Sequence, residues 1–385
     1  MTRTQQIGGF VEPGFEGVAD AFERNFSERG ELGAAFAAIR DGETVVDLHG
    51  GLADRASGRP WAEDTLQLVF SGTKGFVAVC MLILLERRAL ELDAHVARYW
   101  PEFGKGNVRV RDVVSHTARL PGVDTELGLD AFADFERMAA LLAAQEQSDD
   151  PRAAFCYHAL TYGWLCGELV RRADGRSVGR FFADEVAGPL GLELWIGLPE
   201  EHEPRVSTLG LHERWPTKPR YDVERLARDR LAWSIWGNPP TFERTAFPWN
   251  RRDYHAAEIP GANAIGTARS IARLYACLAR GGELDGVRLL SEDSVRLGRT
   301  ELARGWDAIV EGPLAFGVGF ELQTEDEPFG PVGDAFGHGG AGGSKHGAWP
   351  ALRVGFSYAM NLMRDDEDED GRAQALLRAL HEAVA

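Results

Sequence analysis

The sequence predicts a mixed α/β (α+β) protein, with an antiparallel sheet flanked by helices and an inserted, mainly helical domain. Strand-like apolar runs occur near both ends of the 385-residue chain. The stretch between about residues 71 and 230 is largely helical in spacing and composition. Two early apolar runs flank Asp41-Gly42, a sequence typical of a tight hairpin turn, so the sheet is antiparallel where it begins.

The amino-terminal part is expected to form one helix and one hairpin before a long buried helix. Residues 15–26 have amphipathic spacing, and residues 34–39 and 44–49 are the two strands of the hairpin. From residue 71 to residue 85 the chain is apolar on most faces of a helix, as in a helix at the centre of a protein. Further helices are predicted for residues 93–103, 108–116, 132–145, 162–172 and 178–186.

The carboxy-terminal part returns to strands. Residues 233–254 are rich in aromatic residues and prolines, so we expect an ordered loop there. A helix over residues 268–280 should end at Gly281-Gly282. The remaining elements are a strand over residues 316–322, an alternating, half-exposed strand over residues 353–362, an acidic turn at residues 365–370 and a closing helix over residues 373–384.

This order of elements predicts two domains. We expect a sheet domain formed by residues 1–70 and 255–385, and a mainly helical domain over residues 71–254. Both ends of the chain then contribute to one sheet, with the helical domain inserted between them. Clefts between domains are a usual place for ligands, so the active site is expected in the cleft.

Composition restricts the partners and the location of the protein. A formal net charge of -17 argues against nucleic acid and anionic membranes as partners. No apolar stretch resembles a signal peptide or approaches the roughly 18 residues that span a bilayer. The four cysteines form no Cys-x-x-Cys, and no His or Cys spacing fits a metal. We therefore expect a cytoplasmic protein without metal or cofactor, and the sequence is compatible with a homo-oligomer.

The most informative motif is Ser71-Gly72-Thr73-Lys74, the only Ser-x-x-Lys in the sequence. On one helical turn the two end side chains point the same way, so the Lys amine can act as the base that activates the Ser hydroxyl. Ser-x-x-Lys is the nucleophile motif of β-lactamases and penicillin-binding proteins. The alternative is that Ser71 only caps the helix that follows.

Two further segments carry chemistry compatible with this motif. Tyr157 lies within residues 155–163, and a Tyr beside a Lys can hold a lowered pKa and pass a proton to a leaving group. The alternative is two core tyrosines at the start of a helix. Residues 336–344 are rich in glycine, which lets a strand edge approach a ligand and offer a backbone N–H to an oxyanion. A Gly-rich bulge or turn is the alternative there.

In this order and spacing, the three segments resemble the serine β-lactamase-like hydrolases of the class C type. That family includes class C β-lactamases, D-Ala-D-Ala carboxypeptidases and the family VIII carboxylesterases. The resemblance extends over most of the chain and includes residues 110–122, 266–273 and 281–286. It implies a β-lactamase/transpeptidase-like fold.

The resemblance also implies a role for each site residue. Ser71 would be the acylated nucleophile and Lys74 its base partner. Tyr157 would be the second general base and then the acid. The triplet His338-Gly339-Gly340 would stand where the lactamases carry Lys-Thr-Gly, with His338 in the place of the Lys. The N–H of Ala341 would join that of Ser71 in the oxyanion hole.

Two departures from the family pattern favour esters over β-lactams. Tyr-x-Asn has become Tyr157-His158-Ala159, which removes the Asn that contacts the side-chain amide of a lactam. His338 replaces a Lys and is only partly charged at neutral pH, so a fixed charge for the lactam carboxylate is lost. The resemblance thus implies a serine carboxylesterase acting on small or short-acyl esters. Hydrolysis of β-lactams, D-amino-acid peptides or amides, acyl transfer, and an inert binding protein are the alternatives.

Several other residues have a functional and a structural interpretation. Trp233, Trp236 and Trp249 could line an apolar pocket for the acyl or alcohol group, or could serve packing. Ser177 lies in a Gly-x-Ser-x-Gly sequence, but that nucleophile motif requires a strand-to-helix turn and a helix precedes it here. Ser177 is therefore expected to cap the next helix. His116 is expected to be a structural residue rather than a metal ligand.

Overall fold

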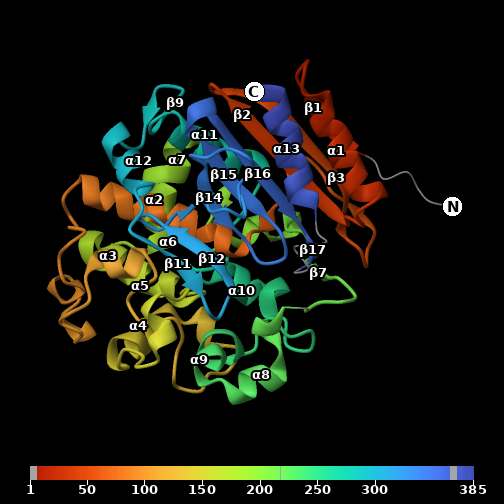
Figure 1. The fold of residues 1–385 in the computed structure, drawn as a ribbon. Helices are drawn as coiled ribbons and strands as arrows, with labels where there is room; N and C mark the ends of the chain where they lie inside the picture. The colour runs from red at the N-terminus through yellow and green to blue at the C-terminus, as the bar shows by residue number, and fades with distance from the viewer. Residues whose placement is uncertain (1–6, 217, 365–370) are drawn as a thin grey trace.

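The structure is a computed structural model that describes residues 7–216, 218–364 and 371–385. It confirms the mixed α/β fold with an antiparallel sheet and many helices (Figure 1). The acidic turn expected at residues 365–370 lies outside the described residues. Among the described helices, none combines the length and the apolarity that crossing a bilayer requires.

One antiparallel sheet is built from both ends of the chain. Its ten strands follow the order β1-β3-β2-β16-β15-β14-β13-β12-β11, with β4 paired to β3. The order confirms that early and late segments share one sheet, because β2 pairs directly with β16. The strands are β1 (Ile7–Val11), β2 (Gly33–Arg40), β3 (Glu43–Asp54), β4 (Arg59–Pro60), β11 (Ala303–Asp307), β12 (Gly312–Phe316), β13 (Glu321–Leu322), β14 (Phe336–Gly339), β15 (Lys345–Trp349) and β16 (Val354–Met360).

Helices cover both faces of this sheet. Helices α1 (Glu16–Ser27) and α13 (Arg372–Val384) pack together on one face, and α11 (Ala268–Ala279) covers the other. The central strand β16 is buried along its whole length, so the expectation of a half-exposed strand is wrong. Large and small side chains alternate along β16. The large ones face α1 and α13, and the small ones face α11. At Gly355, a Cβ would lie 2.0 Å from the backbone nitrogen of Ala276 in α11.

Two predicted turns show how glycine shapes the sheet. The hairpin between β2 and β3 is confirmed, and Asp41 and Gly42 both have positive φ, 54° and 98°, as a two-residue turn of this kind needs. The single strand expected at residues 316–322 is instead the hairpin of β12 and β13, with Phe316 paired to Glu321. Gly319, at φ 78°, allows the chain to reverse there.

The middle of the chain is mainly helical, with two corrections. Residues 93–103 form only the short 3₁₀ turns Val96–Arg98 and Pro101–Phe103, because Pro101 and the left-handed Gly104 interrupt a helix. Residues 108–116 contain only the short α3. The helices are α2 (Thr73–Glu86), α3 (Val110–Val114), α4 (Phe135–Ala144), α5 (Thr161–Asp174), α6 (Val178–Phe182), α7 (Gly188–Leu190), α8 (Val223–Arg228), α9 (Arg230–Ala232), α10 (Arg252–Ala256) and α12 (Glu292–Gly298).

Helix α2 connects the sheet with the helical part. Figure 1 shows α3, α4, α5, α8 and α9 grouped below and to the left of the sheet, with α2 between the two groups. Nearly every residue of α2 is buried. One continuous apolar cluster contains Ala37 of the sheet, Leu82 of α2 and Leu165 of α5. The boundaries of two separate domains therefore remain a prediction.

Candidate active site

Ser71 lies in a 3₁₀ turn, Phe70–Gly72, that leads directly into α2. The Nζ atom of Lys74 is 2.9 Å from its Oγ atom, as the three-residue spacing predicts. The N-cap of α2 is Gly72, with no side-chain capping bond. The alternative that Ser71 is merely a helix cap is therefore wrong.

The surroundings of Lys74 favour a neutral amine. Its side chain is fully buried, and Nζ lies 2.6 Å from the carbonyl oxygen of Ala159 and 2.7 Å from that of Gly261. Burial lowers the pKa of Lys74 well below its usual value, while the negative charge of Glu321 acts in the opposite direction. A neutral amine has two N–H groups and one lone pair. In the structure Nζ donates to all three oxygens; once it has lost a proton, its two N–H groups match the two carbonyls, which leaves the lone pair for the Ser71 hydroxyl.

The backbone just before the nucleophile is strained. Phe70 has φ 45°, a conformation that bulky residues rarely adopt. Its ring is held between Trp249, at 5.1 Å between ring centroids, and Phe242, at 5.6 Å. The hydroxyl of Thr73 donates to the Phe70 carbonyl at 2.6 Å. Packing and hydrogen bonding thus hold the turn that presents Ser71.

Tyr157 reaches this pair from the segment before α5. Nζ of Lys74 lies 4.9 Å from the centre of the Tyr157 ring. Burial raises the pKa of Tyr157, and the nearby Ser71 side chain offsets this only in part. The expectation of a lowered pKa is therefore wrong: desolvation dominates, and the neighbouring Lys74 is itself driven toward the neutral form.

The backbone N–H groups of Ser71 and Ala341 both lack an acceptor within the described part of the chain. The Gly-rich strand end comes close to the nucleophile turn, because a Cβ at Gly340 would lie 2.3 Å from the carbonyl oxygen of Val69. The N–H of Gly340 donates to the Ser344 carbonyl at 2.9 Å, which closes the tip between β14 and β15. The two free N–H groups are thus available to a ligand oxygen.

His338 is buried and neutral, not partly charged as the sequence suggested. Nδ1 is 2.8 Å from the carbonyl oxygen of Gly339, so this nitrogen carries the proton. Burial lowers the pKa of His338 well below its usual value, and the positive charge of Lys345 acts in the same direction. Its Nε2 atom is buried and finds no partner among the described residues. The N–H of the adjacent Gly339 lies 3.3 Å from Oε2 of Glu321. His338 therefore offers this site an acceptor and no positive charge.

The three tryptophans differ in their placement. Trp249 is fully buried behind Phe70, and its indole N–H donates to the Thr241 carbonyl, so its role is packing. Trp236 keeps 8% of its surface exposed and packs on aromatic neighbours. Trp233 is half-buried below the guanidinium of Arg230. Contact of Trp233 or Trp236 with a substrate remains a prediction.

Ser177 and His116 have the structural roles predicted for them. Ser177 accepts the N–H of Arg180 as the N-cap of α6, and its hydroxyl donates to Glu258 at 2.6 Å. His116 is buried, accepts the N–H of His158 on Nδ1, and packs against the ring of Tyr157 at 5.0 Å. It is a structural residue that supports the Tyr157 segment.

Several residues that surround the site belong to no motif that could be recognised in the sequence. Glu321 is a carboxylate 3.8 Å from His338, and it comes from the hairpin that was expected to be one strand. His346 faces His338 across β14 and β15, and a Cβ at Gly72 would lie 2.6 Å from its ring. Asp307 accepts the backbone N–H of Tyr157. Only the pairing of late strands brings these residues to the nucleophile.

No group of three or more His, Cys, Asp or Glu side chains that could hold a metal ion is found in the described ranges. The four cysteines are free and buried, as predicted for core residues. The cytoplasmic location remains a prediction.

Fold and site together define a serine hydrolase of the β-lactamase type, and the comparisons agree. The chain belongs to the β-lactamase family, whose model matches residues 19–381. It is similar to the esterase/beta-lactamase LipL of Mycobacterium tuberculosis, with 35% identity over 375 residues, 93% of this chain and 84% of that protein. These findings confirm the family predicted from the sequence.

Two solved structures are also similar over nearly the whole chain. A family VIII carboxylesterase has 36% identity and a TM-score of 0.88, and the match covers 98% of this chain and 100% of that one. A penicillin-binding protein homologue from Caulobacter crescentus has 36% identity and a TM-score of 0.89, with the same coverage.

Proposed function

We propose that this hydrolase cleaves small or short-acyl carboxylic esters through an acyl-enzyme on Ser71. The observation that carries the proposal is the environment of Lys74: two carbonyl acceptors at 2.6 and 2.7 Å and the Ser71 hydroxyl at 2.9 Å. In this setting the neutral amine takes the Ser71 proton as the oxygen attacks the ester carbonyl. The N–H groups of Ser71 and Ala341 stabilise the oxyanion that forms.

Tyr157 completes the proton transfer in this proposal. Because burial keeps its pKa high, Tyr157 is protonated before the reaction and donates its proton to the departing alkoxide. The proton that Lys74 took from Ser71 then returns to Tyr157. Water attacks the acyl-enzyme next, and the same groups act in reverse order to release the carboxylic acid and restore Ser71.

Two features favour esters over β-lactams. A β-lactam carries a carboxylate, and the neutral, buried His338 provides no cation to bind it. Ala159 also lacks an amide side chain that could hold the acylamino group. Among the relatives, one is named an esterase/beta-lactamase and one a family VIII carboxylesterase, so weak β-lactam hydrolysis is a second candidate.

The test compares p-nitrophenyl acetate and butyrate with nitrocefin in one assay. We expect ester kcat/KM to exceed nitrocefin kcat/KM by at least about 100-fold, and Ser71→Ala to reduce ester hydrolysis by about 10⁴-fold or more. Ser177→Ala is the matched control, because it changes a Ser that caps a helix, and it should keep full activity. Equal hydrolysis of nitrocefin would contradict the ester preference, and an active Ser71→Ala would remove the nucleophile assignment.

A further inference from the structure

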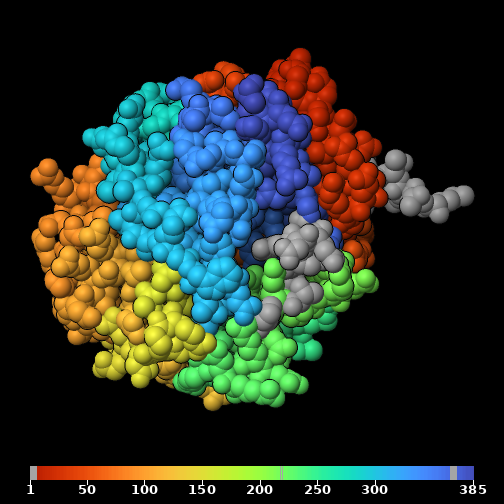
Figure 2. All heavy atoms as spheres, in the orientation of Figure 1, coloured from red at the N-terminus to blue at the C-terminus, as the bar shows by residue number. Residues whose placement is uncertain are grey.

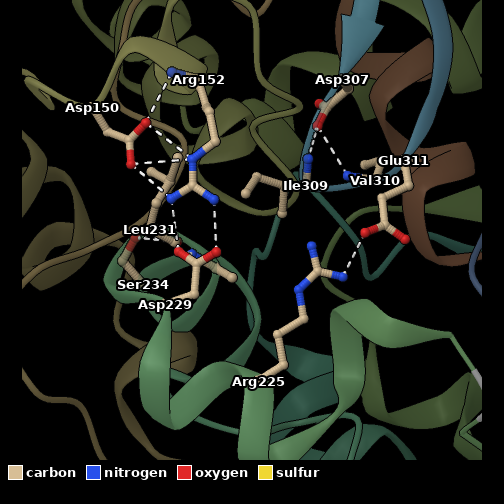
Figure 3. Close-up of polar contacts among 11 residues, drawn as sticks. Asp150, Arg152, Arg225, Asp229, Leu231, Ser234, Asp307, Ile309, Val310 and Glu311 are labelled. Atoms are coloured by element: carbon tan, nitrogen blue, oxygen red, sulfur yellow. Dashed lines mark hydrogen bonds and ion pairs between the residues drawn. The ribbon is translucent and has the colours of Figure 1, made fainter.

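Asp307 is a buried carboxylate that contacts the backbone of Tyr157. It is the last residue of β11 and has no exposed surface. Its Oδ2 atom accepts the N–H of Tyr157 at 2.5 Å. Its Oδ1 atom accepts the N–H groups of Ile309 at 2.7 Å and Val310 at 2.9 Å (Figure 3). Within the described ranges no Lys or Arg forms an ion pair with it.

Capping of a turn explains only half of this arrangement. An Asp often accepts N–H groups two and three residues ahead of it in a turn, and Oδ1 does this. The other oxygen, Oδ2, instead reaches a residue 150 positions earlier in the chain. A buried carboxylate without a cation is costly, and three N–H donors are the compensation. The three backbone N–H donors are divided between the two carboxylate oxygens, two on Oδ1 and one on Oδ2, so each oxygen has its own role.

Tyr157 depends on such a contact because no regular element holds its backbone. It lies between the 3₁₀ turn Pro151–Ala154 and the start of α5. The β11–β12 hairpin contacts this segment at three points. Asp307 accepts the Tyr157 N–H, the ring of Phe316 stacks on the Tyr157 ring at 6.1 Å, and Gly305 lies against Phe155.

The hairpin is itself attached to the helical part of the chain. Glu311 pairs with Arg225 of α8 at 2.7 Å, and Figure 2 shows the light-blue hairpin region against the green region of α8. Directly after α8, Asp229 pairs with Arg152, which also pairs with Asp150 (Figure 3). These ion pairs close a ring of contacts that runs from Tyr157 through the hairpin and α8 back to the residues before Tyr157.

We propose that Asp307 is a positioning residue for the reaction. Its carboxylate fixes the backbone of Tyr157, so that the hydroxyl stays within reach of Ser71 and of the departing alkoxide. The proposal rests on the proposed function, because it needs Tyr157 in the proton transfer. A displacement of about 1 Å in a reacting group can reduce the rate by about 100-fold.

The first test is Asp307→Asn. The single carbonyl oxygen of Asn can keep the two bonds to Ile309 and Val310, and its amide then faces the N–H of Tyr157. We expect kcat for p-nitrophenyl butyrate to fall by about 10- to 100-fold while KM changes by less than about threefold. Glu168→Gln is the matched control, because it neutralises another buried carboxylate, one that pairs with Arg171 and Arg172, and it should keep kcat.

Asp307→Ser is a second variant in case the first folds poorly. Serine still caps the turn and removes the buried charge, but it is too short to reach Tyr157, so the same loss of kcat is expected. Circular dichroism and thermal unfolding of each variant establish that the folded protein is assayed. Wild-type kcat in a folded Asp307→Asn or Asp307→Ser protein overturns the proposal.

A double-mutant cycle with Tyr157→Phe separates positioning from general damage. If Asp307 acts through the Tyr157 hydroxyl, Asp307→Asn adds less than about threefold to the loss that Tyr157→Phe already causes. An undiminished loss in the Tyr157→Phe background overturns the positioning role and leaves the proposed function intact. Wild-type activity in Tyr157→Phe alone overturns both the proton-transfer role of Tyr157 and the role of Asp307.

Discussion

The nucleophile turn and the Tyr157 segment meet at one site but are held in place by different means. Ser71 and Lys74 are three residues apart, and the geometry of one helical turn brings their side chains to 2.9 Å. Tyr157 lies outside any helix or strand. Its backbone is held by Asp307 and its ring by His116 and Phe316. The first region is formed by local geometry, and the second exists only when distant segments have packed.

The contrast between local and distant contacts is not absolute, because the protonation of Lys74 also depends on groups that are distant in the sequence. Its position follows from the helix, but its two other acceptors are the carbonyls of Ala159 and Gly261. Burial by the surrounding core lowers its pKa. Local structure therefore places the base, and tertiary structure makes it a base.

After loss of the nucleophile itself, replacing the base has the largest expected effect. In Lys74→Met the proposed proton acceptor is absent, and we expect kcat for a short-chain ester to fall by about 10³-fold. Lys74→Arg is the control, since it places there a cation that has no lone pair to accept a proton. Both variants should be inactive, as measured by steady-state hydrolysis of p-nitrophenyl butyrate. Wild-type kcat in Lys74→Arg would show that charge, not proton transfer, is the contribution of Lys74.

Removing the hydroxyl from the other region should cost less. We expect Tyr157→Phe to lower kcat by about 10²-fold with little change in KM, because the ring and its packing remain. Tyr275→Phe is the matched control. Its hydroxyl is also buried but has no partner among the described residues, so its removal should leave kcat unchanged. A larger loss in Tyr275→Phe than in Tyr157→Phe would contradict the assignment.

Acid should destabilise the protein, because buried neutral histidines lie beside both the nucleophile turn and the Tyr157 segment. Burial lowers the pKa of His158 to about 4 and that of His346 to about 3, and it lowers those of His116 and His338 as well. Below pH 6.5 the unfolded chain takes up protons that the folded protein does not. The free energy of unfolding should therefore fall with the pH, by up to about 1.4 kcal/mol per pH unit for each histidine.

Urea unfolding between pH 7.5 and 5 measures this slope. His158→Gln is an informative variant, because Gln can accept the N–H of Leu120 without gaining a proton, and it should reduce the slope. The loss for His158 begins below pH 6.5 and ends near pH 4, where the folded form also becomes protonated. Equal stability at pH 7.5 and pH 5 would contradict the buried neutral state.

The smallest expected effect concerns the free energy of unfolding. It compares the loss of a buried hydrogen-bonding side chain beside Ser71 with the loss of partly exposed ion pairs near Tyr157. Thr73 is buried, and its hydroxyl donates to the Phe70 carbonyl and accepts the N–H of Ala264. Thr73→Val leaves both without a partner, and we expect a loss of about 2 kcal/mol in the free energy of unfolding. Arg152→Gln breaks ion pairs that solvent reaches, so its loss should stay below about 1 kcal/mol. The reverse order in urea unfolding would contradict this account.

Several features could be predicted because they depend on short stretches of sequence. The Asp41-Gly42 hairpin follows from two residues that tolerate positive φ. The N-cap at Ser177 follows from its position between two helical patterns. Other elements could not be predicted. The alternation in β16 looked half-exposed, since periodicity does not tell whether a small residue such as Gly355 faces water or the backbone of a helix.

Residue patterns alone were enough to predict the family, the pairing of Ser71 with Lys74, and a sheet formed by both ends of the chain. The family follows from the resemblance of three motifs, and the other two follow from residue spacing, which the helical and strand repeats convert into geometry. The neutral state of His338, the raised pKa of Tyr157 and the contact of Asp307 with Tyr157 depend on the folded arrangement of the whole chain. Protonation depends on burial, and burial at this site is produced by segments far apart in the sequence that the sheet brings together.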